Sequence, residues 1–210
     1  MSIYPLRFPK IFRYFFPSAV LKKKNNNNTV YLTFDDGPTP EITNFVLNEL
    51  KKYNAKATFF CLGDKIERYP DILKDVIDAG HLIGNHTYHH FDAWKTSQKD
   101  YLKDVINTEA VIDKYTTGKK LFRPPFGHVT PWHIKGLKKL GFQTVLWTSI
   151  AGDYKQNLDT DKVVQKLINQ TRSGDILVFH DSKKASENLR KILPELLKSL
   201  HQKSFNFDSL

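Results

Sequence analysis

The sequence contains very few sulfur-bearing residues. Its 210 residues include one cysteine and one methionine, which excludes a disulfide framework and a cluster of thiolate metal ligands. Cys61 lies within the apolar run 57–62. We therefore expect a buried and unreactive thiol, as is usual for free cysteines.

Long apolar segments are also missing. No stretch approaches the ~18 apolar residues that a membrane-spanning helix requires. The segment 1–21 is apolar and aromatic, but three basic residues and three prolines interrupt it, whereas a signal peptide places its basic residues before an unbroken apolar stretch. We expect no transmembrane segment, no signal peptide, and a cytoplasmic or peripheral location. The segment is interpreted as an arm packed across the domain, with a membrane-surface role as the less favoured alternative.

Acidic residues are the minority among the charged ones. The chain has 22 Asp and Glu against 32 Lys and Arg, a net charge of +10. Such a charge can indicate a nucleic-acid partner, but the basic residues are scattered and no nucleic-acid-binding motif accompanies them. We interpret them as a solvated surface, predict that nucleic acid is not a partner, and expect a monomer.

Apolar side chains are plentiful enough for a sizeable core. Hydrophobic residues make up 40% of the sequence and aromatic residues 13%, which argues against a disordered chain. The length corresponds to one domain at ~100–200 residues per domain. The polar run Asn25–Asn28 indicates a boundary, so we predict an arm and linker over residues 1–28 and a domain over residues 29–210.

Strand-like and helix-like patterns alternate after this boundary. Strands are predicted over 29–34, 57–62, 81–85, 121–123, 142–147 and 176–179, with 204–207 as a candidate seventh. Helices are predicted over 40–53, from residue 70 to about 79, and over 99–116, 131–140, 161–171 and 187–200. This alternation is typical of a parallel sheet covered by helices.

The predicted fold class is α/β, a distorted (β/α) barrel of about seven parallel strands that is similar to a TIM barrel. An open, doubly wound sheet is the alternative. No glycine-rich phosphate loop follows the first predicted strand, and this absence disfavours a nucleotide-binding fold.

Ionisable residues follow the ends of five predicted strands, where a parallel barrel carries its catalytic groups. They are Asp35, Asp36, His86, His90, Arg123, Asp153, His180 and Asp181. Two histidines and one carboxylate can form a three-ligand metal site that leaves positions open for substrate. These donors suit Zn and also Co, Mn or Fe. Adjacent aspartates cannot easily point at one atom, so one is expected to bind metal and the other to act as general base.

Five segments of the sequence resemble the motifs of the polysaccharide deacetylase family, also known as the NodB-homology domain or carbohydrate esterase family 4. They are Thr-Phe-Asp-Asp-Gly-Pro (33–38), His-Thr-Tyr-His-His (86–90), Arg-Pro-Pro-Phe-Gly (123–127), Gly-Asp-Tyr (152–154) and Leu-Val-Phe-His-Asp (177–181). The resemblance runs from about Thr29 to the C-terminus in the family's order, and the first two motifs are the most specific. It implies a distorted (β/α) barrel and metal-dependent removal of N- or O-acetyl groups from sugars.

The resemblance also implies a role for individual residues around the metal. Asp35 would be the general base, held ionised and oriented by Arg123. Asp36, His86 and His90 would bind one divalent ion, for which Zn is the favoured identity.

Further residues are assigned to the leaving group and to the substrate groove by the same resemblance. His180 would be the general acid, and Asp153 would orient it and favour its protonated form. The backbone N–H of Phe126 would stabilise the oxyanion. Tyr154 would be the aromatic residue of the groove, and Val178 would line a pocket for the acetyl methyl group.

The sequence departs from the family pattern at three positions. Phe126 stands where the family usually has tyrosine, and Val178 where it usually has leucine. In the fourth motif Ile150 replaces the first aspartate and Tyr154 replaces tryptophan. Outside the motifs, Trp94 could stack on a sugar or simply fill a loop, and His128 could face the cleft.

The predicted function is a metal-dependent hydrolase that removes N-acetyl groups from N-acetylglucosamine-containing polysaccharide, either peptidoglycan or a chitin-like polymer. An O-acetyl esterase acting on acetylated xylan is the alternative within the same class. A catalytically impaired carbohydrate-binding protein is the alternative from another class, and Phe126 is the feature that suggests it. The positive charge alone supports a nucleic-acid binder.

Overall fold

A buried parallel strand, β1 (Thr29–Asp35), lies at the centre of the computed structural model, which describes residues 7, 14, 16, 18–24 and 27–210. It pairs in parallel with β2 (Thr58–Cys61) on one side and with β7 (Ile176–His180) on the other. All seven residues of β1 are buried, as expected for a parallel strand that is covered on both faces.

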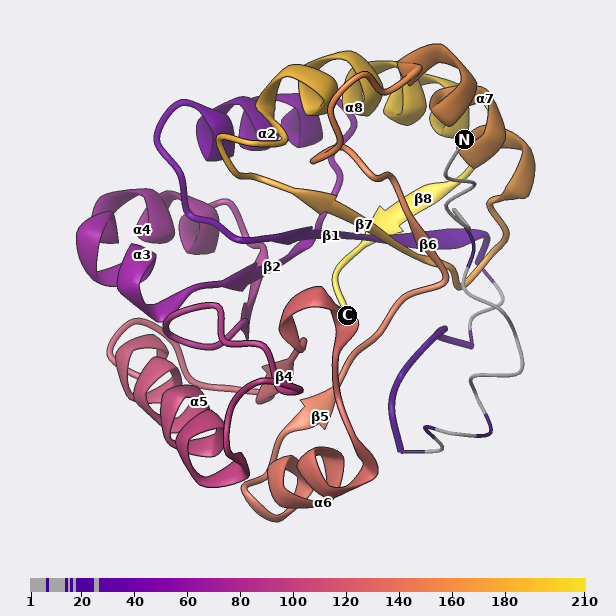
Figure 1. Cartoon of the computed structure of the whole chain (residues 1–210). Helices are drawn as coiled ribbons and strands as arrows, with labels where there is room; N and C mark the ends of the chain where they lie inside the picture. Colours follow the sequence, from indigo (N-terminus) through magenta and orange to yellow (C-terminus); the bar gives the residue numbers. More distant parts are fainter. Residues whose placement is uncertain (1–6, 8–13, 15, 17, 25–26) are drawn as a thin grey trace.

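The remaining strands extend this arrangement into a curled parallel sheet (Figure 1). They are β3 (Leu82–Asn85), β4 (Leu121–Phe122), β5 (Gln143–Thr144) and β6 (Ser149–Ile150). In the described part of the chain the strand order is β5-β4-β3-β2-β1-β7-β6, and a short strand, β8 (Asn206–Asp208), pairs with the beginning of β1. The predicted distorted barrel of about seven parallel strands is confirmed.

The prediction of one strand over residues 142–147 is wrong, because the chain changes partners there. The N–H of Val145 donates to the carbonyl of Phe122 next to β4, whereas the N–H of Thr148 donates to the carbonyl of Ile176 in β7. The segment therefore crosses from one edge of the curled sheet to the other and forms two short strands instead of one.

Helices cover the outside of the sheet (Figure 1). They are α2 (Ile42–Lys51), α3 (Gly63–Arg68), α4 (Pro70–Asp78), α5 (Gln98–Ile112), α6 (Pro131–Lys139), α7 (Thr160–Gln170) and α8 (Ser186–Gln202), with a 3₁₀ turn at η1 (Pro125–Gly127). Pro70 begins α4 as predicted, since its fixed φ suits the first helical turn. The six-residue helix α3 was not predicted, because so short a segment shows little periodicity.

Described residues of the N-terminal segment contact the sheet near its open edges. Val20 forms a parallel bridge with Val145. Arg7 and Lys22 both form ion pairs with the buried carboxylate of Asp175, which directly precedes β7. Most of the predicted arm, residues 1–21, lies outside the described residues, so its packing across the domain and the boundary at residue 28 stay predictions. None of the helices described combines the length and apolarity needed to cross a bilayer.

Candidate active site

One carboxylate and two imidazoles converge where β1 and β3 end. Asp36 Oδ1 lies 3.2 Å from His90 Nε2 and 3.6 Å from His86 Nε2. A ligand atom from each residue lies within 4.8 Å of the others. The fold thus brings together Asp36, which follows β1, His86, which follows β3, and His90 from the same loop as His86.

The surroundings of these three side chains fit a divalent metal ion. Asp36 Oδ1 is buried and has no hydrogen-bond partner among the described residues. His86 Nδ1 lies 2.7 Å from the carbonyl oxygen of Arg123. This contact places the proton on Nδ1 and leaves the lone pair of Nε2 free to bind a metal. Burial lowers the pKa of His86 to about 4, so its imidazole is neutral near pH 7.

Asp36 is ionised near pH 7, as a carboxylate ligand of a metal ion must be. Burial opposes ionisation of its carboxyl group, but contact with His90 and the charge of His180 outweigh burial and lower its pKa. Asp36, His90 and Phe126 all have positive φ angles, of 75°, 59° and 59°. Such a backbone costs ~1–3 kcal/mol per residue, and residues of this kind cluster at functional sites.

Asp35 is held by a buried arginine. Arg123 Nη1 donates to Asp35 Oδ1 at 2.8 Å and to Thr33 Oγ1 at 2.6 Å. The same guanidinium donates to the carbonyls of Val145 and Leu146, so one side chain links β1, β4 and the segment that joins β5 to β6. The Asp35 carboxylate therefore has a fixed orientation beside the three candidate ligands.

His180 forms a second buried pair with Asp153. Its Nδ1 and the Asp153 Oδ1 atom are 2.8 Å apart, and its backbone N–H donates to Asp153 Oδ2. Burial lowers the pKa of His180, but the charge and hydrogen bond of Asp153 outweigh burial and raise it to about 9. The ring is therefore protonated near pH 7, the state that a proton donor needs. Tyr154 packs edge-on against it, with ring centroids 4.9 Å apart.

A pocket of about 490 Å³ connects these groups. This volume suits a small ligand. The lining comprises Asp35, Asp36, His86, His90, Pro124, Phe126, Gly127, His128, Trp147, Ile150, Tyr154, Val178, His180, Ser182 and Lys184. Arg123 and Asp153 do not line the pocket but contact the lining residues Asp35 and His180. Trp94 lies outside the pocket and stacks on the ring of His128.

Asp104 was missed in the sequence, although it anchors the loop that carries His86 and His90. This buried aspartate of α5 accepts hydrogen bonds from the backbone N–H groups of Tyr88 and His89, at 2.7 Å and 3.0 Å. It also contacts the ring of His89, which is thereby placed away from the candidate metal ligands. No local signal marks Asp104, because its partners lie 15 and 16 residues earlier.

Asp181 fills a similar supporting position behind Asp36. Thr43 Oγ1 donates to Asp181 Oδ2 at 2.6 Å, and the N–H of Thr39 donates to Thr43. A Cβ atom on Gly37 would lie 2.0 Å from Asp181 Oδ2, so the loop after Asp36 needs glycine at this position. Burial raises the pKa of Asp181 to about 7.

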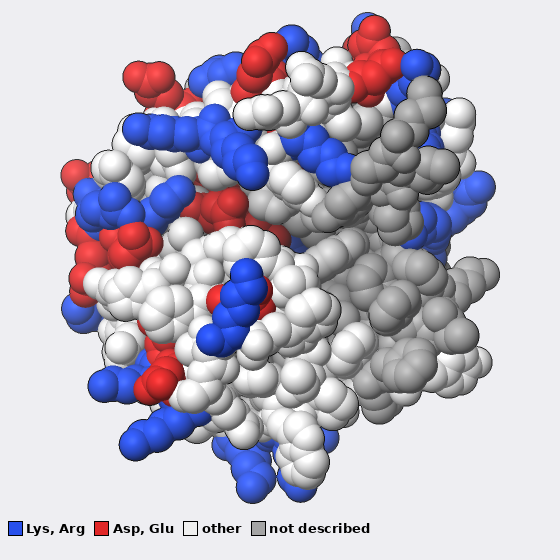
Figure 2. All heavy atoms as spheres, in the orientation of Figure 1, with Lys and Arg blue, Asp and Glu red and all other residues white. Residues whose placement is uncertain are grey.

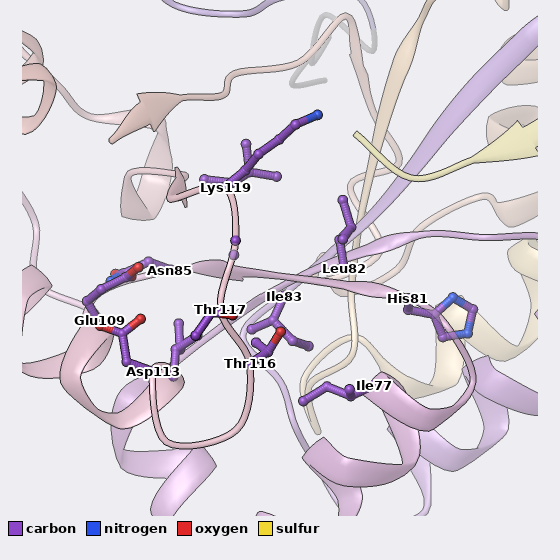
Figure 3. A pocket seen from close by; sticks show the side chains of 14 residues that line it. Ile77, His81, Leu82, Ile83, Asn85, Glu109, Asp113, Thr116, Thr117 and Lys119 are labelled. Atoms are coloured by element: carbon purple, nitrogen blue, oxygen red, sulfur yellow. The ribbon is translucent and has the colours of Figure 1, made fainter. Parts of the chain in front are cut away.

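A smaller hollow of about 60 Å³ is lined by β3, the end of α5 and the residues 116–119 that follow it (Figure 3). Two of its polar side chains bind each other, because Asn85 Nδ2 donates to Glu109 Oε2 as well as to the carbonyl of Val105. Asn85 Oδ1 in turn accepts the N–H of Thr87. The hollow is too small for a sugar ring, and these contacts fix the backbone on both sides of His86.

The basic residues do not gather around the pocket. Figure 2 shows Lys and Arg spread over one face of the molecule and mixed with Asp and Glu. Among the described residues, Lys184 is the one lysine or arginine that lines the pocket.

Comparison with known proteins identifies the family. The sequence profile of the polysaccharide deacetylase family matches residues 22–145, more than half of the chain. A peptidoglycan-N-acetylglucosamine deacetylase from Bacillus cereus is 37% identical over 175 residues, which are 80% of this chain and 82% of that protein. The chain therefore belongs to the polysaccharide deacetylase family and is a hydrolase of this class.

Two further comparisons support this assignment. The peptidoglycan-N-acetylmuramic acid deacetylase PdaA from Bacillus subtilis is 33% identical over 87% of this chain and 70% of its own length. The crystal structure of the peptidoglycan N-acetylglucosamine deacetylase Bc1960 superposes with a TM-score of 0.86, with 30% identity, over 92% of this chain and 91% of that one. The predicted enzyme class is thereby confirmed.

Proposed function

We propose that this chain removes the acetyl group from N-acetylglucosamine residues of peptidoglycan. The observation that carries the proposal is the arrangement around one pocket of a candidate metal site, the Asp35–Arg123 pair and the His180–Asp153 pair. The names of the relatives support peptidoglycan rather than a chitin-like polymer as the substrate.

Asp36, His86 and His90 would hold the metal ion, and zinc suits two imidazoles and one carboxylate. When bound, the ion supplies a Lewis acid for the acetyl carbonyl and makes a water molecule easier to deprotonate. Asp35 lies at the same end of β1 and accepts the proton from the attacking water. Arg123 compensates the negative charge of Asp35 in this buried setting.

His180 would donate a proton to the nitrogen of the leaving amine. An amine is a poor leaving group until it is protonated, so cleavage of an amide requires an acid at this position. Asp153 keeps His180 protonated and fixes its orientation through two contacts of 2.8 Å. The side chain of Phe126 has no hydroxyl group, so Phe126 would stabilise the oxyanion through its backbone N–H alone.

Removal and return of metal tests this proposal. The chain is dialysed against a chelator, and acetate release from peptidoglycan is measured before and after addition of zinc or cobalt. We expect release to stop in the metal-free sample and to return with either ion, and Asp36→Ala to remain inactive after zinc is added. Full activity in a sample verified to be metal-free would contradict the proposal.

Analysis of the product distinguishes the possible substrates. Peptidoglycan treated with the enzyme is hydrolysed to its amino sugars after the free amines have been labelled. We expect the label on glucosamine. Label on muramic acid alone would mean that the enzyme acts on N-acetylmuramic acid, as the name of PdaA states for that protein. Release of acetate from acetylated xylan but not from peptidoglycan would favour an esterase.

A further inference from the structure

A row of aromatic rings leads away from the candidate metal site. His90 and Phe126 meet edge-on with ring centroids 4.6 Å apart, and Phe126 lies 5.7 Å from His128. His128 in turn stacks on Trp94, with centroids 3.6 Å apart and planes inclined by 7°. The row starts at a candidate metal ligand, follows the pocket wall at Phe126 and His128, and ends outside the pocket.

The last two rings are held parallel by Asp92. Its Oδ1 atom accepts the backbone N–H of Trp94 at 2.9 Å and lies 2.9 Å from His128 Nδ1. One carboxylate oxygen thus fixes both the loop that carries Trp94 and the ring against which Trp94 stacks. We call the three residues Asp92, Trp94 and His128 the Trp94 platform.

Two side chains of the row, Trp94 of the platform and Phe126 beside it, are exposed, which is unusual for large apolar side chains. Trp94 is 64% exposed and Phe126 60%. One face of the Trp94 indole is covered by His128, and much of the rest of the side chain is open to solvent. A rigidly oriented, exposed aromatic surface that continues from a pocket is typical of a binding site.

We propose that the Trp94 platform is a subsite that binds a sugar ring of the glycan chain beyond the residue being deacetylated. The inference rests on the proposed function, in which the substrate is a polymer that must extend out of the pocket. The C–H face of a pyranose ring is apolar and its edge carries hydroxyl groups. Such a ring can cover the free indole face while its hydroxyls stay in water.

Substrates of two sizes test the platform. The kcat/KM value is measured on an N-acetylglucosamine pentamer and on an aryl acetate, which is too small to reach beyond the pocket. We expect Trp94→Ala to lower the pentamer-to-aryl-acetate ratio about tenfold, equivalent to ~1.4 kcal/mol, mainly through KM. An unchanged ratio would overturn the proposal.

Trp132→Ala is the matched control. Trp132 is a second exposed tryptophan, 70% exposed on α6, and it does not line the pocket. We expect this variant to keep the wild-type ratio. An equal drop in both tryptophan variants would show a general effect of surface tryptophans and would also overturn the subsite.

A double-mutant cycle tests the role of Asp92 as a positioning residue. If Asp92 acts through Trp94, Asp92→Ala lowers the same ratio, and the double variant loses no more than Trp94→Ala alone. Asp92→Asn keeps an oxygen acceptor for the Trp94 N–H and should retain most of the ratio. If the losses from Asp92→Ala and Trp94→Ala were fully additive, Asp92 would not act through Trp94.

Binding measured without turnover separates this proposal from the proposed function. The pentamer is titrated into metal-free wild type and metal-free Trp94→Ala in a calorimeter. Weaker binding by the variant supports the platform even if the wild-type enzyme releases no acetate from the pentamer. Equal binding by both proteins would overturn the platform even if deacetylation is demonstrated.

Discussion

At the scale of single residues, the two adjacent aspartates at the end of β1 have different surroundings. Asp35 still belongs to the strand and faces the buried guanidinium of Arg123. Asp36 has a positive φ of 75°, so the backbone turns there and the carboxylate faces His86 and His90. The two carboxylates can therefore perform different tasks, although they are neighbours in the sequence.

The variant Asp35→Asn tests this division. Asparagine preserves the size of the side chain and can still accept a hydrogen bond from Arg123, but it cannot act as a base. We expect turnover to fall by ~10²–10⁴, the range that general-base catalysis contributes, while bound metal measured by atomic emission stays at the wild-type level. Loss of metal with turnover retained would mean that the two roles are reversed.

The variant Asp153→Asn tests the proton donor through pH dependence. His180, the proposed proton donor, can donate only while protonated, and its pKa is raised to about 9 chiefly because Asp153 outweighs the effect of burial. Acid-dependent activity is therefore present below this pKa and is lost as the pH rises through it. The variant lacks the negative charge while burial remains, so the pKa falls and the alkaline limb of kcat/KM on the amide substrate moves to lower pH.

Hydrolysis of an aryl acetate serves as the control for this experiment. Its phenolate leaves without help from an acid, so its alkaline limb should not follow the shift seen with the amide. If the amide profile of Asp153→Asn coincides with that of wild type, His180 is not the proton donor or Asp153 does not set its pKa.

At the scale of elements, the loop that carries two candidate metal ligands is fastened to a helix. Asp104 of α5 accepts the N–H groups of Tyr88 and His89. On the other side, Asn85 joins the end of β3 to the same helix. The position of His86 and His90 thus depends on how α5 packs against β3, and the loop sequence alone does not define it.

Asp104→Ala should weaken metal binding although Asp104 does not contact the metal site. Removal of such supporting hydrogen bonds typically costs about 10–100-fold in metal affinity. The affinity is measured by competition with a zinc-binding dye. The control Asp100→Ala changes an exposed aspartate on the same helix and should leave the zinc affinity unchanged. If Asp104→Ala bound zinc as tightly as wild type, the loop would hold its shape without α5.

At the scale of the whole molecule, the two edges of the curled sheet are joined by a single segment. Residues 143–150 pair first with β4 and then with β7, and Arg123 donates to the carbonyls of Val145 and Leu146 between the two strands. The buried cation consequently fastens this connection and Asp35 together, so closure of the sheet and orientation of the proposed base depend on the same side chain.

The N-terminal segment should stabilise this region through Asp175. Its carboxylate is fully buried and receives Arg7 at 2.8 Å and Lys22 at 3.1 Å. The double variant Arg7→Ala/Lys22→Ala leaves that charge without either cation. We expect the free energy of unfolding, measured with urea, to fall by ~1.5–3 kcal/mol, the range for a hydrogen bond to a charged group.

Two further variants check that this effect passes through Asp175. In an Asp175→Asn background, the same two alanine substitutions should cost much less, because no buried charge remains to be compensated. Lys162→Ala removes an exposed lysine of α7 that pairs with a half-exposed aspartate and should be nearly neutral. Equal losses in both backgrounds would exclude the proposed ion pairs as the cause.

Much of the fold could be predicted from the sequence because strand and helix formation depend on local patterns. The apolar strands and the amphipathic helices were recognisable, and so was the parallel arrangement. The break between β5 and β6 was not, because residues 142–147 are uniformly favourable for a strand. The strand ends early because residues 143–144 pair with β4, whereas the chain pairs with β7 only at residues 149–150.

The motifs of the site were likewise evident from the sequence, since each one is a short run of neighbouring residues. The sequence alone determined the residue types and the strand end at which each motif stands. The tertiary structure decided which side chains meet, such as Arg123 with Asp35, Asp104 with the Tyr88–His89 backbone, and Trp94 with His128. These partners are between 15 and 88 residues apart, and a contact over such a separation forms only when the helices and the sheet have packed together.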